Sequence, residues 1–206
     1  MNEMAPTHVL TFPTPPPVPV EAPPDARKVG MVTFFVSEVA FFSTLIMTYV
    51  IYLGDSLASP TPAEALSLPL VIGTTLCLLS SSLTIHLAEK ALRASNRTGF
   101  ALFWTLTIIL GCLFIAGTGY EWFDLITKHH LTISRNLFGT TFFTLVGFHG
   151  LHVSVGLVLL IVMLVLVMRN RINPPESMGI ELVSWYWHFV DVVWVVVFLV
   201  VYVFGR

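Results

Sequence analysis

Seven side chains that can exchange a proton lie inside long apolar stretches of this sequence. An ionisable group in such surroundings is costly, so each of them needs a functional or structural explanation. Carboxyl and imidazole groups are also the side chains that proteins use to collect and relay protons. We expect a polar intramembrane network made of Glu38, His86, Glu121, His149, His152, His188 and Asp191.

We expect the apolar stretches to form helices that pack side by side in a bundle. All of these residues except Glu121 then lie between the middle and one end of that bundle. At a rise of about 1.5 Å per residue, Glu38 lies about 13 Å from the start of its apolar stretch, and Asp191 about 12 Å from the start of another. His188 precedes Asp191 by three residues, so the two side chains share a helix face. The pattern predicts a polar layer in one half of the bundle.

Two interpretations fit this layer. The groups could collect or relay protons, or they could pair with one another and hold the helices together. Pairing that holds the helices together is the favoured interpretation for His149, His152, His188 and Asp191. For Glu38, whose neighbours along the chain are mostly phenylalanine and valine, both interpretations remain open.

Metal binding is the other chemistry that histidines offer. Imidazole is a common haem, copper and zinc ligand, and a pair such as His149 and His188 could in principle hold one haem. A centre with two haems and a copper needs more intramembrane histidines than this chain has, and no Cys/His set has zinc spacing. Cys77 and Cys112 stand alone in apolar runs, which is typical of packing residues. We therefore expect no metal to be bound by this chain.

Composition indicates the elements that position these groups. The 206 residues are 55% hydrophobic and 11% charged, whereas soluble domains carry about 25% charged residues. A helix needs about 20 apolar residues to cross a bilayer, and in lipid its backbone must be hydrogen-bonded internally. The sequence predicts an all-α integral membrane bundle, residues 29–206, with five transmembrane helices. The expected spans are 29–53, 66–88, 100–126, 138–168 and 183–204.

The distribution of Lys and Arg predicts the orientation. Seven of these residues fall on the side of the N-terminus and three on the other, and the positive-inside rule places the richer side in the cytoplasm. We expect a cytoplasmic N-terminus and an external C-terminus. With a formal net charge of −2 and no basic stripe, nucleic acid is not an expected partner.

Residues 1–28 differ from the rest in composition. They hold eight of the thirteen prolines, which favours polyproline II over helix, and they lack the apolar core of a signal peptide. We expect an extended cytoplasmic arm, either a free tail or a strap along a neighbouring subunit. At the start of the fifth span, Trp185, Tyr186 and Trp187 are typical of an interfacial belt, and Trp185 and Trp187 are candidates for contact with lipid headgroups.

Four stretches of the sequence resemble subunit III of cytochrome c oxidase, one of the haem–copper respiratory oxidases. The resemblance covers residues 27–206. It rests on Gly30-Met31 with Ser37-Glu38-Val39 and Phe41-Phe42, on Tyr120-Glu121-Trp122, on 138–143 (FGTTFF) with 147–153 (GFHGLHV), and on Gly179-Ile180-Glu181 with 185–194 (WYWHFVDVVW).

The resemblance implies a non-redox subunit of a proton-pumping terminal oxidase. Such a subunit carries no haem or copper, packs against subunit I, which holds the oxygen-reducing centre, and lies in a complex with subunit II. It holds phospholipid, sustains proton uptake and protects the active site from inactivation. The family's carbodiimide-reactive glutamate corresponds to Glu38 and its glutamate near the outer end of a span to Glu121. A basic residue that meets lipid phosphate corresponds to Arg169 or Arg171.

The resemblance is to the five-span bacterial form, because the two spans that precede the Glu38 helix in longer members are absent here. This implies the bacterial cytoplasmic membrane. The electron donor is expected to be cytochrome c, with a quinol oxidase subunit or an accessory protein of nitric oxide reductase as alternatives. An intrinsic haem protein and a proton-coupled transporter are more distant alternatives that rest on the intramembrane histidines and carboxylates.

Overall fold

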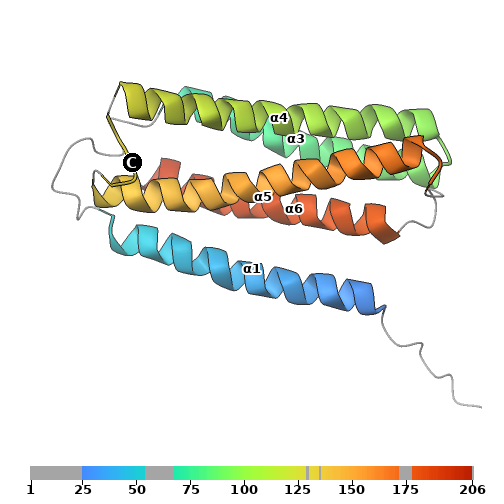
Figure 1. Cartoon of the computed structure of the whole chain (residues 1–206), viewed down its shortest axis with the longest axis horizontal. Coiled ribbons are helices and arrows are strands. Elements are labelled where there is room, and N and C mark those ends of the chain that lie inside the picture. The colour runs from blue at the N-terminus through green and yellow to red at the C-terminus, as the bar shows by residue number, and fades with distance from the viewer. Residues whose placement is uncertain (1–24, 54–66, 129, 135, 172–177, 206) are drawn as a thin grey trace, which may run out of the picture.

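The computed structural model describes residues 25–53, 67–128, 130–134, 136–171 and 178–205, and the regular structure in these ranges is helical (Figure 1). All five long helices have the length and apolar composition to cross a membrane, which confirms the predicted fold class. Residues 1–24 of the expected arm lie outside the described ranges. The elements are α1 (Ala26–Ile51), α3 (Leu68–Arg93), α4 (Arg97–Thr127), α5 (Leu137–Met168), and α6 (Met178–Phe198) continued by the π-helix η2 (Leu199–Phe204).

The helices differ from the expected spans mainly at their ends. The last helix begins at Met178, five residues before the expected start, and α3 continues to Arg93 beyond the expected end at residue 88. Hydropathy marks the apolar centre of a helix, but backbone hydrogen bonding carries the helix on into polar residues such as Glu181.

Short polar side chains cap three of the helices. The Asp25 carboxylate accepts a hydrogen bond from the Arg27 N–H at 2.9 Å at the start of α1. The Asn96 and Asn136 side chains accept from the backbone N–H three residues on, at 2.9 and 2.7 Å, and cap α4 and α5. Each cap satisfies a backbone donor that the helix leaves free.

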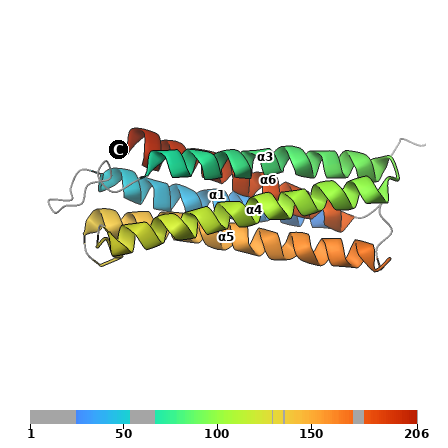
Figure 2. The same ribbon diagram turned by 90° about the horizontal axis from the view of Figure 1, so that it is seen from above.

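The helices form three layers. α3 and α4 lie side by side, α5 and α6 form the next layer, and α1 lies on the far side of α5 and α6 (Figures 1 and 2). The start of α1, the α3–α4 turn, the end of α5 and the start of α6 meet at one end of the bundle (Figure 1). We call it the basic end, because it carries Arg93, Arg97, Arg169 and Arg171.

The helices α3, α4, α5 and α6 with η2 form a four-helix body, and the buried Trp187 packs at its centre. Trp187 of α6 lies against Gly111 of α4 and Gly156 of α5, where an added Cβ would come within 2.7 and 2.9 Å of the indole. Its Nε1–H donates to the Ser81 hydroxyl of α3 at 2.8 Å. One side chain therefore touches three other helices, and its polar atom is satisfied.

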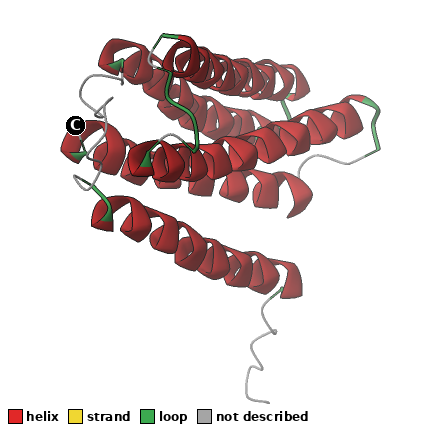
Figure 3. Cartoon of the chain, turned by 60° about the vertical axis from the view of Figure 1, so that its left-hand side comes forward, coloured by secondary structure: helices red, strands yellow, loops and turns green. Residues whose placement is uncertain are grey.

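Helix α1 lies beside α5 and α6 (Figure 3), and its contacts with them centre on one stripe of residues. Phe42 and Tyr49 are the two α1 side chains that are fully buried. The Phe35 ring stacks on Phe189 of α6 with centroids 4.8 Å apart. The stripe repeats every three or four residues, as helix–helix packing requires. We call it the packing face of α1: Lys28, Met31, Phe35, Glu38, Phe42, Leu45 and Tyr49.

Candidate functional site

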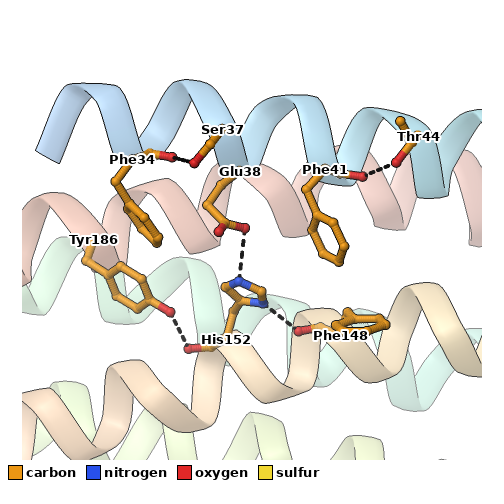
Figure 4. A network of polar contacts seen from close by, with 8 residues as sticks. All are labelled: Phe34, Ser37, Glu38, Phe41, Thr44, Phe148, His152 and Tyr186. Carbon is orange, nitrogen blue, oxygen red and sulfur yellow. Dashed lines mark hydrogen bonds and ion pairs between the residues drawn. The ribbon is translucent and has the colours of Figure 1, made fainter. Parts of the chain in front are cut away.

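Glu38 on the packing face of α1 meets His152 of α5. Its Oε2 atom lies 3.1 Å from the His152 Nε2 atom, and the two side chains are 18% and 17% exposed (Figure 4). The residues are 114 positions apart in the sequence, and their contact joins α1 to α5.

The hydrogen bonds of His152 limit where its protons can be. Its Nδ1 atom lies 2.7 Å from the backbone carbonyl oxygen of Phe148, and because a carbonyl only accepts, Nδ1 carries a proton. The hydrogen bond between Nε2 and the Glu38 carboxyl then contains one more proton, which is bonded either to the imidazole or to the carboxyl. The pair is an imidazolium with a carboxylate or a neutral imidazole with a carboxylic acid. Both forms satisfy the same two atoms, so the proton can move between them.

Aromatic groups hold His152 in this position. The Tyr186 hydroxyl of α6 donates to the His152 backbone carbonyl at 3.0 Å (Figure 4). The Phe42 ring lies edge-on to the imidazole, with centroids 5.0 Å apart, and Phe34 stacks on Tyr186. Three helices therefore fix the geometry of the pair.

The pair lines a groove of about 440 Å³ formed by α1, α5 and α6. Apart from Glu38, His152 and the Tyr186 hydroxyl, its walls are hydrocarbon. The groove is suited to an apolar chain that passes a single polar position. Its apolar walls include Met31, Phe34, Leu151, Val155, Leu159 and Leu182.

His188 and Asp191 of α6 belong to a second cluster and are joined through a residue of α3. Ser82 Oγ lies 3.0 Å from His188 Nδ1, and the Ser82 hydroxyl also donates to Asp191 Oδ2. The sequence predicted that the two α6 residues share a face but did not single out Ser82. The available signal was the polar run of residues 80–82 inside an apolar helix.

Glu121 lies apart from both clusters, near the end of the bundle opposite the basic end. Its Oε2 atom accepts a hydrogen bond from the Tyr202 hydroxyl of η2 at 2.8 Å, and its side chain is buried. Its other carboxyl oxygen and the Tyr49 hydroxyl have no hydrogen-bond partner within the described ranges. Glu121 thus helps to join α4 to η2.

Residues 22–206 match the family model for cytochrome c oxidase subunit III. The chain belongs to this family. It is 39% identical over 186 residues to cytochrome c oxidase subunit 3 of Synechocystis, which covers 87% of this chain and 76% of the relative. It is 34% identical over 179 residues to the probable subunit 3 of Mycobacterium leprae, covering 87% and 88%. A relative from Alkalihalophilus pseudofirmus is also 34% identical over 179 residues, covering 87% of each chain.

Family membership confirms the oxidase interpretation. The chain is a subunit of the cytochrome c oxidase complex, a haem–copper oxidase, and other oxidase subunits are its partners. Its relatives are bacterial and it has five candidate membrane spans, so it is an integral protein of the bacterial cytoplasmic membrane. The haem-protein, transporter and quinol-oxidase alternatives are not what the match supports.

As a subunit III, this chain shows no group of three or more His, Cys, Asp or Glu residues that could hold a metal ion among its described residues. His149 is buried, and its ring stacks on Trp194 with centroids 4.8 Å apart. Phe114 lies edge-on to the same imidazole at 5.8 Å. Neither ring nitrogen of His149 has a hydrogen-bond partner in the described part of the chain. His149 therefore packs among aromatic rings, because α5 turns the His149 and His152 rings towards different neighbours.

The residues expected to contact lipid headgroups differ in their exposure. Trp187 is completely buried at the centre of the body, so its expected headgroup contact was wrong. Trp185 is half-buried, and the Lys28 ammonium group lies 5.5 Å from the centroid of its ring. Arg169 and Arg171 are exposed at the basic end, where they stay predicted sites for lipid phosphate.

Proposed function

We propose that this subunit III supports proton uptake by the oxidase complex through the Glu38–His152 pair. The contact of 3.1 Å between the Glu38 carboxyl and the His152 imidazole is the observation that carries the proposal. Because the Phe148 carbonyl holds the Nδ1 proton, the pair exchanges protons through His152 Nε2 and the Glu38 carboxyl. A partly exposed carboxyl–imidazole pair of this kind can take up a proton and pass it on.

The position of the pair favours uptake from the cytoplasm. The basic end collects the arginines of the α3–α4 turn and of the end of α5, and the positive-inside rule places it in the cytoplasm. Glu38 is twelve residues into α1, about 18 Å from that end. The pair would then receive protons from the cytoplasmic side and hold them at the edge of the subunit.

The groove beside the pair supports a second part of the proposal, which is phospholipid binding. Its hydrocarbon walls fit an acyl chain, and Arg169 and Arg171 at the basic end offer charges for a phosphate. A bound lipid would exclude water from the space around Glu38 and shield the main contact with subunit I. In this way the subunit would keep proton supply fast and protect the active site during turnover.

The Glu38→Gln variant of the intact oxidase complex tests the proposal. The amide keeps the shape of the side chain but cannot release a proton, so we expect normal assembly and haem content together with slower proton uptake or a shorter turnover lifetime. Glu181→Gln is the matched control, since Glu181 pairs with Lys28 at the end of the same α1–α6 interface. Normal proton pumping and a normal inactivation rate in Glu38→Gln would rule out the role of the pair.

A further inference from the structure

The Ser82–His188–Asp191 cluster is not used by the Glu38–His152 pair, and its geometry supports a separate function. Asp191 is buried, with 4% of its surface exposed, and its Oδ1 atom has no hydrogen-bond partner among the described residues. Ser82 Oγ touches both His188 Nδ1 and Asp191 Oδ2. One hydroxyl therefore bridges a half-buried imidazole and a buried carboxyl.

The titratable groups at this cluster differ in exposure. One helical turn from Ser82 towards the basic end, His86 is exposed. His188 and Glu89 are half-buried, and both His86 and Glu89 lie close enough to His188 to act on its charge. Asp191 is the most deeply buried member. Titratable groups thus lead from the surface at the basic end to a carboxyl inside the α3–α6 interface.

The bridge is satisfied before and after the transfer of one proton. In the first state, His188 is an imidazolium whose Nδ1–H donates to Ser82 Oγ, and the Ser82 hydroxyl donates to the ionised Asp191 Oδ2. In the second state, the hydroxyl proton has moved to Oδ2 and the Nδ1 proton has moved to Oγ. The new Asp191 O–H donates to Ser82, and the new Ser82 hydroxyl donates to neutral His188. In each state both hydrogen bonds of the bridge have one donor and one acceptor, and net charge is unchanged.

We propose that Ser82, His188 and Asp191 form a second proton site, in which Asp191 stores a proton that enters from the basic end through His86 and His188. If the Ser82 hydroxyl contacted only one of these two side chains, it would form an ordinary hydrogen bond between helices. The presence of a titratable group on each side of the hydroxyl, with both within hydrogen-bonding reach, is what makes transfer possible.

Two titratable groups near α6 belong to α3, and the others are engaged elsewhere. His86 and Glu89 of α3 lie within electrostatic range of His188. From α5 and α1, His152 and Glu38 pair with each other, and the Tyr186 hydroxyl of α6 donates to the His152 carbonyl. His149 of α5 packs against Trp194 without a hydrogen bond to the described residues, and Lys28 of α1 pairs with Glu181 at the basic end. The titratable groups that act on the site are therefore those of the α3–α6 interface itself.

Infrared difference spectroscopy of the purified oxidase complex after a rapid pH step tests this proposal. We expect a carboxyl band that appears as the pH falls, shifts in heavy water and is absent in Asp191→Asn. Ser82→Ala removes the bridging hydroxyl, and it should slow the appearance of the band by about a hundredfold. Ser82→Thr keeps a hydroxyl and should restore the rate.

The controls separate this site from both a structural role and the Glu38 pair. Ser154→Ala removes a hydroxyl that bonds to the carbonyl of Gly150 in its own helix, so it should leave the band and its rate unchanged. Glu38→Gln should also keep the Asp191 band, whatever that variant does to proton uptake. An unchanged rate in Ser82→Ala, or an Asp191 band that does not respond to pH in the unmodified complex, would overturn the proposal.

Discussion

Helix α1 and the four-helix body are both transmembrane and apolar, but they are held in different ways. In the most apolar 18 residues of α1, 6% are buried, against 44% for the span Met178–Phe204 in the body. The body is fixed by interlocking indoles and glycines. α1 is fixed by one stripe that carries aromatic contacts and two polar pairs, Lys28–Glu181 and Glu38–His152.

This difference has a consequence for function. The helix that carries Glu38 has few buried contacts within the chain, so polar contacts determine much of its position. Its outward face is apolar, with Val36 66% exposed and Met47 60% exposed, and must be covered by lipid or by another oxidase subunit. Proton exchange at Glu38 thus acts on one of the contacts that hold its own helix, whereas the Ser82–Asp191 bridge is embedded in a rigid interface.

The largest expected effect is in the body. Trp187→Ala removes a fully buried indole that touches three other helices and leaves the Ser81 hydroxyl without its donor. We expect the free energy of unfolding to fall by about 3–5 kcal/mol. Denaturant unfolding of the purified subunit in detergent micelles measures this loss.

Trp185→Ala is the matched control for Trp187→Ala. It removes the same side chain two residues earlier on α6, where the indole is half-buried beside Lys28. We expect a much smaller loss of stability. Equal losses in the two variants would contradict the view that the body is fastened by its central tryptophan.

Much of the fold could be predicted from the sequence, because a membrane span is a local property. Five apolar runs of about 20 residues or more give five helices, whatever their neighbours are. The ends were less accurate, as at Met178, because a polar residue can continue a helix at the membrane surface. The three-residue spacing of His188 and Asp191 correctly indicated a shared face.

The partners across helices could not be predicted in this way. His152 meets Glu38 over 114 residues and Ser82 meets Asp191 over 109, and hydropathy does not say which helix faces meet. For the same reason the prediction that Trp187 lies at the membrane surface was wrong. Its place near the start of a span indicated the membrane surface, but the space left by glycines of two other helices directs it to the core.

An intermediate effect on the free energy of unfolding should distinguish a glycine of the four-helix body from a glycine of α1. In Gly156→Ala the new Cβ would lie 2.9 Å from the Trp187 ring, and we expect a loss of about 1–3 kcal/mol from overpacking. In Gly30→Ala of α1 the new Cβ meets nothing within 4 Å, and alanine favours a helix by about 1 kcal/mol, so stability should be unchanged or higher. Unfolding of both variants under the same conditions measures the contrast, and a loss in Gly30→Ala as large as in Gly156→Ala would remove it.

The smallest expected effect compares the two polar pairs that hold α1. The Lys28 and Glu181 side chains are 39% and 38% exposed, so their coupling energy in a double-mutant cycle with Lys28→Met and Glu181→Gln should be about 0–1 kcal/mol and should weaken as salt is added. The Glu38–His152 pair is about half as exposed and is flanked by aromatic rings, and salt reaches it poorly. The corresponding cycle with Glu38→Gln and His152→Gln should give a larger coupling that is insensitive to salt. If instead both couplings fell equally with salt, water would reach the two pairs alike, and Glu38 would not be the shielded contact on which a controlled proton exchange depends.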